Sequence, residues 1–373
     1  MGKGKTKIKI ISIVGARPNF IKIAPFCEVI KGHAKSFDHM LIHTGQHYDK
    51  NMSDDIFAGL KIPDPDVNLG IGSAPHAVQT GHIMIKVEEM CLKHRPDWVV
   101  VVGDVNSTMA GALVASKLGI KVAHIEAGLR SFDRTMPEEI NRIVTDQLSD
   151  LLFTPSLDAN QNLRREGIDP DRICLVGNIM IDTIVANLKE IKSRRTYERF
   201  GLSKNGFIYV TLHRPSNVDH KEALRKIVDH LLILAKKLPI IFPGHPRTKR
   251  QLKEFNLRKT MKESSNLHLI DPVSYHDSIS FAMNARLVIT DSGGVQEETT
   301  YLGTPCLTLR PNTERPVTIT EGTNRLTTKE DLLEDAEELI KMPKEEFDSR
   351  IPYLWDGKTA QRIVDKFCVI HNR

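Results

Sequence analysis

The stretch Leu287-Val-Ile-Thr-Asp-Ser-Gly-Gly-Val-Gln-Glu-Glu298 decides the fold. Its apolar start predicts a buried parallel strand, and its turn residues precede a helical pattern that begins at Val295. The two glycines allow positive φ and close backbone approach, while Ser292 is a suitable N-cap. The helix N-terminus favours a phosphate, and Glu297 or Glu298 could bind sugar hydroxyls. A simple helix start, with two acids favouring its dipole, explains the same pattern.

Short β-rich runs alternate with helical patterns along the chain, which predicts an α/β fold with parallel sheets. Helical patterns lie between the strands, for example at Val78–Leu92, Thr108–Leu118 and Glu138–Leu148. The expected strands of the first half are Ile8–Val14, His39–His43, Trp98–Val102, Val122–Ile125, Leu151–Thr154 and Ile173–Val176. Those of the second half are Phe207–Thr211, Ile240–Phe242, Leu267–Ile270, Leu287–Thr290 and Cys306–Leu309.

A chain of 373 residues is too long for one ordinary core, so we expect two domains. The first should be a Rossmann-like domain over residues 1–180, and the second should span residues 200–356. Residues 357–373 should form a helix that packs on the first domain. Ligands of doubly wound sheets bind at the carboxyl ends of the strands, which predicts an active-site cleft between the two domains.

The bulk composition is that of a soluble globular protein, with 40% apolar and 27% charged residues. A formal charge of +5 is small for this length, so we expect no nucleic-acid partner. Apolar runs fall short of the roughly 20 residues of a membrane span, and Gly15 and Arg17 interrupt the first run, against a signal peptide. The five cysteines are scattered and read as reduced thiols, which favours the cytoplasm.

Cofactor and metal fingerprints are missing from the sequence. GxGxxG, GxxxxGK[ST] and HExxH do not occur, and the fifteen histidines are dispersed. We therefore expect no bound cofactor and no metal.

Candidate acids follow two of the predicted strands. Asp104 ends the strand Trp98–Val102, and Glu126 ends Val122–Ile125 within the motif HIEAGLR. A buried carboxylate needs a partner, and Arg130 is the nearest cation in the motif. Asp104 is equally typical of a turn, and Glu126 is compatible with a structural ion pair as well as with a catalytic acid.

Further polar residues lie where other strands end. Glu138 and Arg142 stand four residues apart at a helix start, a spacing typical of an ion pair. Arg17 and Arg214 each precede a proline just past a strand, so both halves open alike, either through an internal duplication or by coincidence. Arg315 could bind a diphosphate bidentately, or it could be a solvated loop charge.

The motifs HIEAGLR, PEEINR, GNIMID, DSGGVQEE, LGTPCLTLR and TERP occur in that order. Together they resemble the non-hydrolysing UDP-N-acetylglucosamine 2-epimerases, which have the two-domain GT-B fold. The resemblance runs from Val14 to about Trp355. It departs from the family at Gly15-Ala-Arg-Pro-Asn19, where GTRPE is common, and at His213-Arg-Pro-Ser-Asn217, where an acid often follows the arginine.

The resemblance implies roles for individual residues, no cofactor, and a homodimer. The implied reacting-centre residues are Asp104, Glu126, Glu138 and His213, with Arg142 beside them. The implied diphosphate and nucleotide contacts are Arg17, Lys22, His213 and Arg315, together with the phosphate cradle Ser292, Gly293 and Gly294. Glu298 would bind the uridine ribose, and Gln46 and His47 resemble part of a second nucleotide-sugar site that activates some members.

The implied reaction is reversible inversion at C2 of UDP-N-acetylglucosamine, by elimination and re-addition of UDP through 2-acetamidoglucal. A 2-epimerase of a UDP-2,3-diacetamido uronic acid would need an added cationic contact. A GT-B glycosyltransferase would need an acceptor, and a hydrolysing epimerase would release free sugar. A nucleotide-sugar sensor would bind without turnover.

Overall fold

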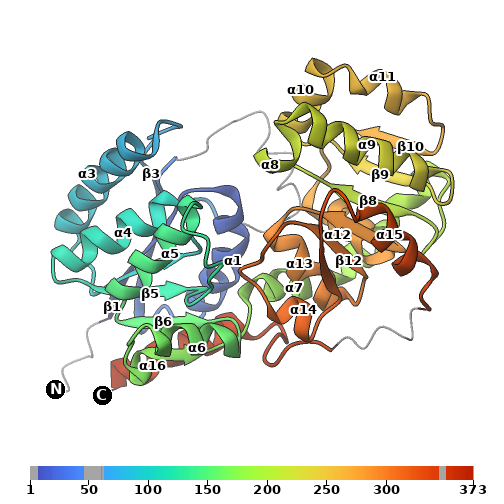
Figure 1. Cartoon of the computed structure of the whole chain (residues 1–373). Helices are drawn as coiled ribbons and strands as arrows, with labels where there is room; N and C mark the ends of the chain where they lie inside the picture. Colours follow the sequence, from blue (N-terminus) through green and yellow to red (C-terminus); the bar gives the residue numbers. More distant parts are fainter. Residues whose placement is uncertain (1–6, 46–59, 61–62, 344–349, 373) are drawn as a thin grey trace, which may run out of the picture. The chain divides into compact units, whose positions relative to one another are not determined.

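The computed structural model describes residues 7–45, 60, 63–343 and 350–372. The chain divides into two compact units. Unit 1 takes the described residues up to Ala186, except Leu60, and those from Tyr353 on, while unit 2 takes Leu60 and the described part of Asn187–Pro352. The boundary falls inside helix α7 (Ile179–Arg194), which is labelled in Figure 1.

Within the described residues, unit 1 holds a seven-stranded parallel sheet of order β3-β2-β1-β4-β5-β6-β7. Its strands are β1 (Ile8–Val14), β2 (Phe37–His43), β3 (Val67–Asn68), β4 (Trp98–Val102), β5 (Lys121–Ile125), β6 (Leu151–Thr154) and β7 (Ile173–Leu175). Its helices besides the start of α7 are α1 (Arg17–Lys31), α3 (His76–His94), α4 (Asn106–Lys117), α5 (Pro137–Leu148), α6 (Leu157–Arg165), the short η1 (Pro170–Arg172) and α16 (Thr359–Asn372).

Both faces of this sheet are covered, which explains why its central strand β4 is wholly apolar and β1 is mostly apolar. Ile10 of β1 and Val100 of β4 pack with α1 and α16, where Phe367 contacts the Trp98 ring edge-on with centroids 5.4 Å apart. Ile11 of β1 faces the opposite way, into a second core with α3 and α4. Alternate residues of one strand therefore enter different cores, and a polar residue inside a strand, such as the buried Ser12 of β1, is tolerated where it is hydrogen-bonded, here to His39 at 2.9 Å.

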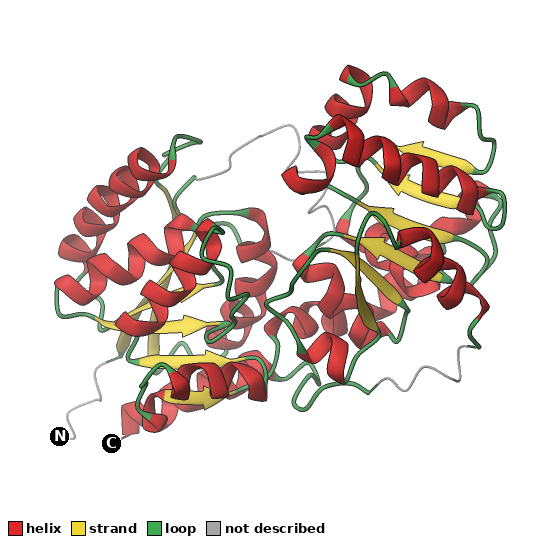
Figure 2. Cartoon of the chain, in the orientation of Figure 1, coloured by secondary structure: helices red, strands yellow, loops and turns green. Residues whose placement is uncertain are grey.

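Unit 2 repeats the plan with a six-stranded parallel sheet of order β10-β9-β8-β11-β12-β13 (Figure 2). Its strands are β8 (Ile208–Thr211), β9 (Ile240–Pro243), β10 (Leu267–Ile270), β11 (Leu287–Thr290), β12 (Cys306–Leu309) and β13 (Asn324–Thr327). Its helices besides the end of α7 are η2 (Thr196–Phe200), α8 (Pro215–Val218), α9 (Lys221–Ala235), α10 (Pro246–Glu254), α11 (Leu257–Lys262), α12 (Tyr275–Asn284), α13 (Gly293–Leu302), α14 (Val317–Thr320) and α15 (Leu332–Lys341).

The two sheets share one winding scheme. In each, the first strand of the unit lies beside the fourth, with the second and third strands on one side and the rest on the other. This is the Rossmann order, and its switch point lies between β1 and β4 in unit 1 and between β8 and β11 in unit 2. The predicted α/β fold is confirmed, and ligands of doubly wound sheets bind at such switch points.

Candidate functional site

Three acid- or cation-bearing segments meet at the switch point of unit 1. Helix α1 follows β1, Asp104 follows β4, and Glu126 follows β5, and these three strands are neighbours in the sheet. Because parallel strands end at the same edge, their polar end residues lie together. A Cβ added to Gly103 would lie 3.4 Å from Glu126 Oε2 and 3.5 Å from Lys22 Nζ, so the residue before Asp104 touches the other two segments.

Glu126 is paired with Lys22, whose ammonium donates a hydrogen bond to Glu126 Oε2. The side chains are 5% and 8% exposed, so this ion pair is nearly buried. The prediction that Arg130 pairs with Glu126 is wrong. The Arg130 guanidinium instead lies 2.7 Å from Asp146 and 2.6 Å from Glu166. Helix α1 thus brings the matching cation to the end of a strand that lies far away in sequence.

The backbone at Glu126 has φ 73°, in the left-handed region that non-glycine residues seldom occupy. Such a conformation costs on the order of 1 kcal/mol or more and is concentrated at functional sites. The strand turns sharply here, directing the carboxylate toward Lys22 at the sheet edge. The strained backbone therefore supports a functional role for Glu126.

The second acid of this edge, Asp104, is held by Arg142. Arg142 is buried on α5 and donates to Asp104 Oδ2 and, at 2.6 Å, to Glu139 Oε2. Burial alone would raise the pKa of Glu139, but backbone hydrogen bonds from Ser131 and the Arg142 guanidinium outweigh it and lower that pKa. The expected pair of Arg142 with Glu138 was wrong, because Arg142 turns inward to Glu139 while Glu138 is exposed.

A buried polar network beneath these groups was not foreseen from the sequence. His124 is 0% exposed and bonds Asp146 through Nδ1 at 2.7 Å and the Gly103 carbonyl through Nε2 at 2.8 Å. Asp146 also accepts from Gly128 N and pairs with Arg130. The network ties the loop after β4, the end of β5 and helix α5 into one rigid support. In the sequence, the only nearby indication of this network is the alternation of the polar residues His124 and Glu126 in the motif HIEAGLR.

In unit 2, Asp291 organises the loop after β8. This fully buried carboxylate accepts from His213 N at 3.0 Å, Arg214 N at 2.9 Å and Asn217 Nδ2 at 3.1 Å, and it lies 3.0 Å from His213 Nδ1. Burial would raise the pKa of Asp291, but His213 and the other donors outweigh it and lower that pKa. Asp291 therefore fixes the His213 ring, whose side chain is 41% exposed.

Helix α13 begins directly after this aspartate. Ser292 is its N-cap, as predicted, although its hydroxyl makes no capping bond. Gly293 has ordinary helical φ and is needed for space: an added Cβ would lie 2.7 Å from Arg315 Nη1 and 2.9 Å from Glu314 Oε1. Arg315 also lies 2.9 Å from Glu297 Oε1. An arginine that is paired with Glu314 and Glu297 thus stands over the helix N-terminus, and the N-terminus itself favours an anion.

Glu298 faces the interior one turn further along α13. Burial and the charge of Glu297 raise the pKa of Glu298 to about 8. The same carboxyl raises the pKa of the buried Tyr275 hydroxyl, an effect second to burial. A carboxyl in this setting carries its proton at neutral pH and can donate a hydrogen bond as well as accept one.

The other predicted residues are placed as follows. Arg17 is the first residue of α1, and Gly294 is the second of α13. Gln46 and His47 lie outside the described residues. Within the described part of the chain, no group of three or more His, Cys, Asp or Glu side chains could hold a metal ion, and no helix is long and apolar enough to cross a membrane.

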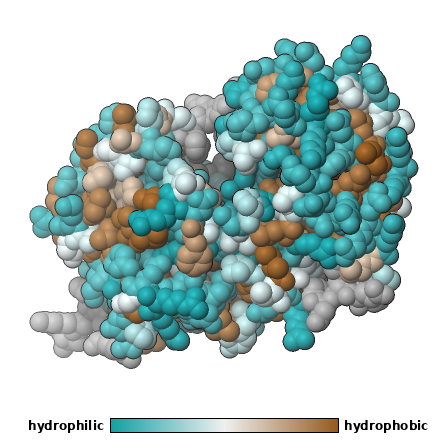
Figure 3. Space-filling model, in the orientation of Figure 1, coloured by the Kyte–Doolittle hydropathy of each residue, from teal (hydrophilic) through white to brown (hydrophobic). Residues whose placement is uncertain are grey.

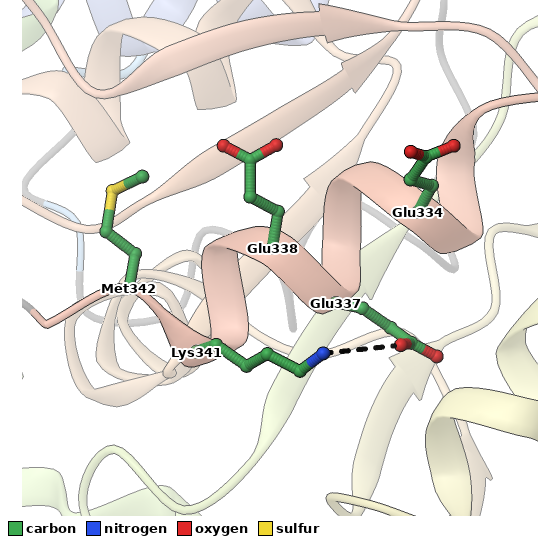
Figure 4. A pocket seen from close by; sticks show the side chains of 5 residues that line it. All are labelled: Glu334, Glu337, Glu338, Lys341 and Met342. Carbon is green, nitrogen blue, oxygen red and sulfur yellow. Dashed lines mark ion pairs between the residues drawn. The ribbon is translucent and has the colours of Figure 1, made fainter.

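Two surface hollows lie away from both switch points. One, of about 520 Å³, is formed on α15 by Glu334, Glu337, Glu338, Lys341 and Met342 (Figure 4). The other, of about 410 Å³, includes Cys27 and His39 in unit 1. Neither contains a predicted site residue. The candidate site therefore lies at the strand ends with their charged side chains, and not in these hollows.

Comparison with known proteins agrees with the motifs. The sequence model of the family described as UDP-N-acetylglucosamine 2-epimerase matches residues 30–367. The UDP-N-acetylglucosamine 2-epimerase of Methanocaldococcus jannaschii is 45% identical over 364 residues, which cover 96% of this chain and 98% of that protein. A UDP-2,3-diacetamido-2,3-dideoxy-D-glucuronate 2-epimerase of Pseudomonas aeruginosa is 43% identical, over 86% of this chain and 88% of its own.

A solved structure extends the likeness to the fold. The crystal structure of the M. jannaschii enzyme in complex with UDP-GlcNAc and UDP has a TM-score of 0.87 at 44% identity. It covers 97% of this chain and 100% of its own. This match confirms the predicted GT-B fold type. Since the family model spans most of the sequence and the relatives match nearly end to end, the chain belongs to the UDP-N-acetylglucosamine 2-epimerase family.

Proposed function

We propose that this chain interconverts UDP-N-acetylglucosamine and UDP-N-acetylmannosamine by inverting C2 of the sugar. Family membership supports this, as does the relative whose crystal structure contains UDP-GlcNAc and UDP. The observation that carries the proposal is the pair of acids on neighbouring strand ends, Glu126 and Asp104, each fixed by its own buried cation, Lys22 and Arg142. The arrangement offers positioned carboxylates for moving a proton.

The chemistry requires more than proton abstraction, because the hydrogen at C2 is not next to a carbonyl. A carboxylate accepts the C2 proton, the C–H electron pair forms a C1=C2 double bond, and the C1–O bond breaks so that UDP leaves with its electron pair. The intermediate is 2-acetamidoglucal. UDP then adds back at C1 while a proton is delivered to the opposite face of C2. Carboxylates serve both to move the proton and to stabilise oxocarbenium-like charge.

In unit 1, Asp104, Glu126 and Glu138 are the carboxylates that we assign to the sugar. Lys22 and Arg142 hold two of them in place, Glu126 and Asp104. Glu138 lies exposed in the first turn of α5, directly before Glu139.

In unit 2, we assign the diphosphate to the N-terminus of α13. Ser292, Gly293 and Gly294 would present the backbone, and Arg315 and His213 would add charge and hydrogen bonds. We assign the uridine ribose to Glu298, whose neutral carboxyl can donate to a hydroxyl oxygen. Arg17 is assigned to the same diphosphate. That both units act on one substrate molecule stays a prediction from the family resemblance.

A second candidate substrate is a UDP-2,3-diacetamido uronic acid, favoured by the 43% identity to the P. aeruginosa enzyme. The two are separated by incubating the purified protein with each UDP-sugar and resolving the products by anion-exchange chromatography. We expect a second UDP-hexosamine from UDP-N-acetylglucosamine and no accumulation of UDP. Conversion of the uronic acid alone would replace our substrate, and stoichiometric free UDP would indicate a hydrolysing enzyme.

We also propose that the protein is cytoplasmic and acts as a homodimer. The free state of all five cysteines fits a reducing compartment, where nucleotide sugars are made. Activation by a second UDP-sugar, for which Gln46 and His47 are candidates, is proposed on the resemblance alone.

A further inference from the structure

Four charged side chains of alternating sign form a buried chain beside the N-terminus of helix α13 in unit 2. Glu314 lies between two arginines: Arg310 Nη2 donates to its Oε2 at 2.6 Å, and Arg315 Nη1 donates to its Oε1. Arg315 Nε in turn lies 2.9 Å from Glu297 Oε1. These side chains are only 1% to 6% exposed, whereas hydrophilic residues cover most of the surface of unit 2 in the view of Figure 3. Charges are buried to this extent only when they are paired.

The first member of this chain, Arg310, stands at the end of β12, directly after Leu309. Asn217 ties this strand end to the start of α13, because its Nδ2 donates to the Leu309 carbonyl at 3.0 Å and to Asp291 Oδ2 at 3.1 Å. Arg310 directs its charge to Glu314, since Nη1, its other terminal nitrogen, is buried and has no hydrogen-bond partner among the described residues. The fold therefore places a hidden cation behind the carboxylate of Glu314.

Glu314 lies at the place where we expect a phosphate. A Cβ added to Gly293, the first residue of α13, would lie 2.9 Å from Glu314 Oε1 and 2.7 Å from Arg315 Nη1. A diphosphate bound at this helix N-terminus would therefore meet a carboxylate as well as a guanidinium. Like charges brought together in a site that excludes water cost affinity, so the charge of Glu314 has to be balanced.

The backbone of Arg315 is fixed, so only its side chain is left to change partners. Arg315 N donates to Thr313 Oγ1 at 3.1 Å, and Thr318 Oγ1 donates to the Arg315 carbonyl at 2.8 Å. Thr313 Oγ1 also donates to Gln296 Oε1 at 2.7 Å, which joins this loop to α13. The guanidinium is thus carried on a rigid loop beside the helix N-terminus.

We propose that Arg310 is a positioning residue for the diphosphate. By holding Glu314 Oε2, it neutralises the carboxylate that faces the phosphate site, so Arg315 can turn to the incoming diphosphate while Glu314 stays with Arg310. With Arg310 the two arginines balance Glu314 and Glu297, and without it the group carries one net negative charge beside an anion. This inference rests on the nucleotide assignment proposed above, and it adds the residue that lets the cradle contain a carboxylate without rejecting phosphate.

The test is the binding of UDP and of uridine to the full-length protein, by calorimetry for UDP and by NMR titration for uridine. Arg310→Met keeps the length of the side chain and removes its charge, and it should weaken UDP binding roughly tenfold or more. It should leave uridine binding unchanged, because uridine has no phosphate for Glu314 to repel. Arg310→Lys keeps the charge and should bind UDP almost as the wild type does.

Arg325→Met is the matched control for the loss of an arginine in unit 2. Arg325 pairs with Glu338 of α15 at 2.9 Å, and this pair is partly exposed, so the change should alter neither affinity. Circular dichroism of each variant checks that the chain is folded.

A charge exchange separates this role from a purely structural one. Glu314→Gln should bind UDP at least as tightly as the wild type, and adding it to Arg310→Met should restore UDP binding. If Arg310 were only a structural brace, uridine binding would weaken together with UDP binding, and the double variant would bind UDP no better than Arg310→Met. That result would overturn the inference, and so would UDP binding weakened by Glu314→Gln, which decides the matter even if Arg310→Met does not fold.

The same titrations distinguish failure of this inference from failure of the proposed function. A wild type that binds UDP and epimerises its sugar, beside an Arg310→Met variant with unchanged UDP affinity, would overturn the role of Arg310 alone. A wild type that binds no UDP would overturn the nucleotide assignment and the role of Arg310 together.

Discussion

Replacing Lys22 by methionine is the sharpest test of the unit 1 site. The change removes the ammonium that pairs with Glu126 while keeping a side chain of similar length, so it strands a carboxylate whose side chain is only 5% exposed. Removing one partner of a buried ion pair costs about 3–5 kcal/mol. For a unit of this size, about 1 kcal/mol lowers Tm by roughly 2–4 °C, so we expect a loss of roughly 6–20 °C in the unit 1 transition.

Differential scanning calorimetry is the assay, with the two unfolding transitions resolved because a two-unit chain need not unfold in one step. The double variant Lys22→Met with Glu126→Gln should recover most of the loss, since neither charge is then left unpaired. Lys237→Met is the control: it breaks the surface pair with Glu337, at 2.6 Å, and should leave Tm unchanged. A shift in Lys22→Met no larger than that of the control, or a double variant as unstable as the single one, would refute the buried pair.

Three further predictions concern the reaction and the nucleotide. Glu126→Gln should lower kcat by roughly 10²–10⁴, as expected for loss of a proton-transferring acid, while UDP binding by calorimetry stays within about twofold; normal turnover would remove Glu126 from the mechanism. Gly293→Val should weaken UDP binding at least tenfold, because the added Cβ would lie 2.7 Å from Arg315 Nη1. An unchanged Kd for UDP would refute the assignment of Ser292, Gly293 and Gly294 to the phosphates. Because the pKa of Glu298 is raised from 4.5 to about 8, its contribution to stability is full below pH 4.5 and is lost as the pH rises to about 8. Glu298→Gln should therefore gain in Tm relative to wild type between about pH 5 and pH 9, and a constant difference would show that the carboxyl is already ionised.

The strands were predictable where both faces are buried. Trp98–Val102 is an unbroken apolar run and Ile8–Val14 is a mostly apolar one, and the structure places β4 and β1 on those residues. Val67–Asn68 has only two residues, and Asn324–Thr327 mixes polar and apolar side chains without alternation, so β3 and β13 were missed. Both lie at sheet edges, where one neighbour is absent and the apolar signal weakens.

The site was predictable as a set of residue types at strand ends, but its pairings were not. From spacing alone, we predicted that Arg130 forms an ion pair with Glu126 and that Arg142 forms one with Glu138. Both predictions used residues four positions apart, because a sequence shows only near neighbours as partners. The fold instead brings Lys22 to Glu126 across 104 positions and Arg142 to Asp104 across 38. Such contacts follow from the order of strands in the sheet, and that order becomes visible only once the sheet is known.

The measurement that tests the central claim most directly is proton NMR of the purified protein with UDP-N-acetylglucosamine in heavy water. Elimination and re-addition predict that UDP-N-acetylmannosamine appears with deuterium at C2, that the recovered substrate also gains deuterium there, and that no net UDP is released. Free N-acetylmannosamine with stoichiometric UDP, a product that keeps its protium at C2, or an unchanged sugar would contradict the account.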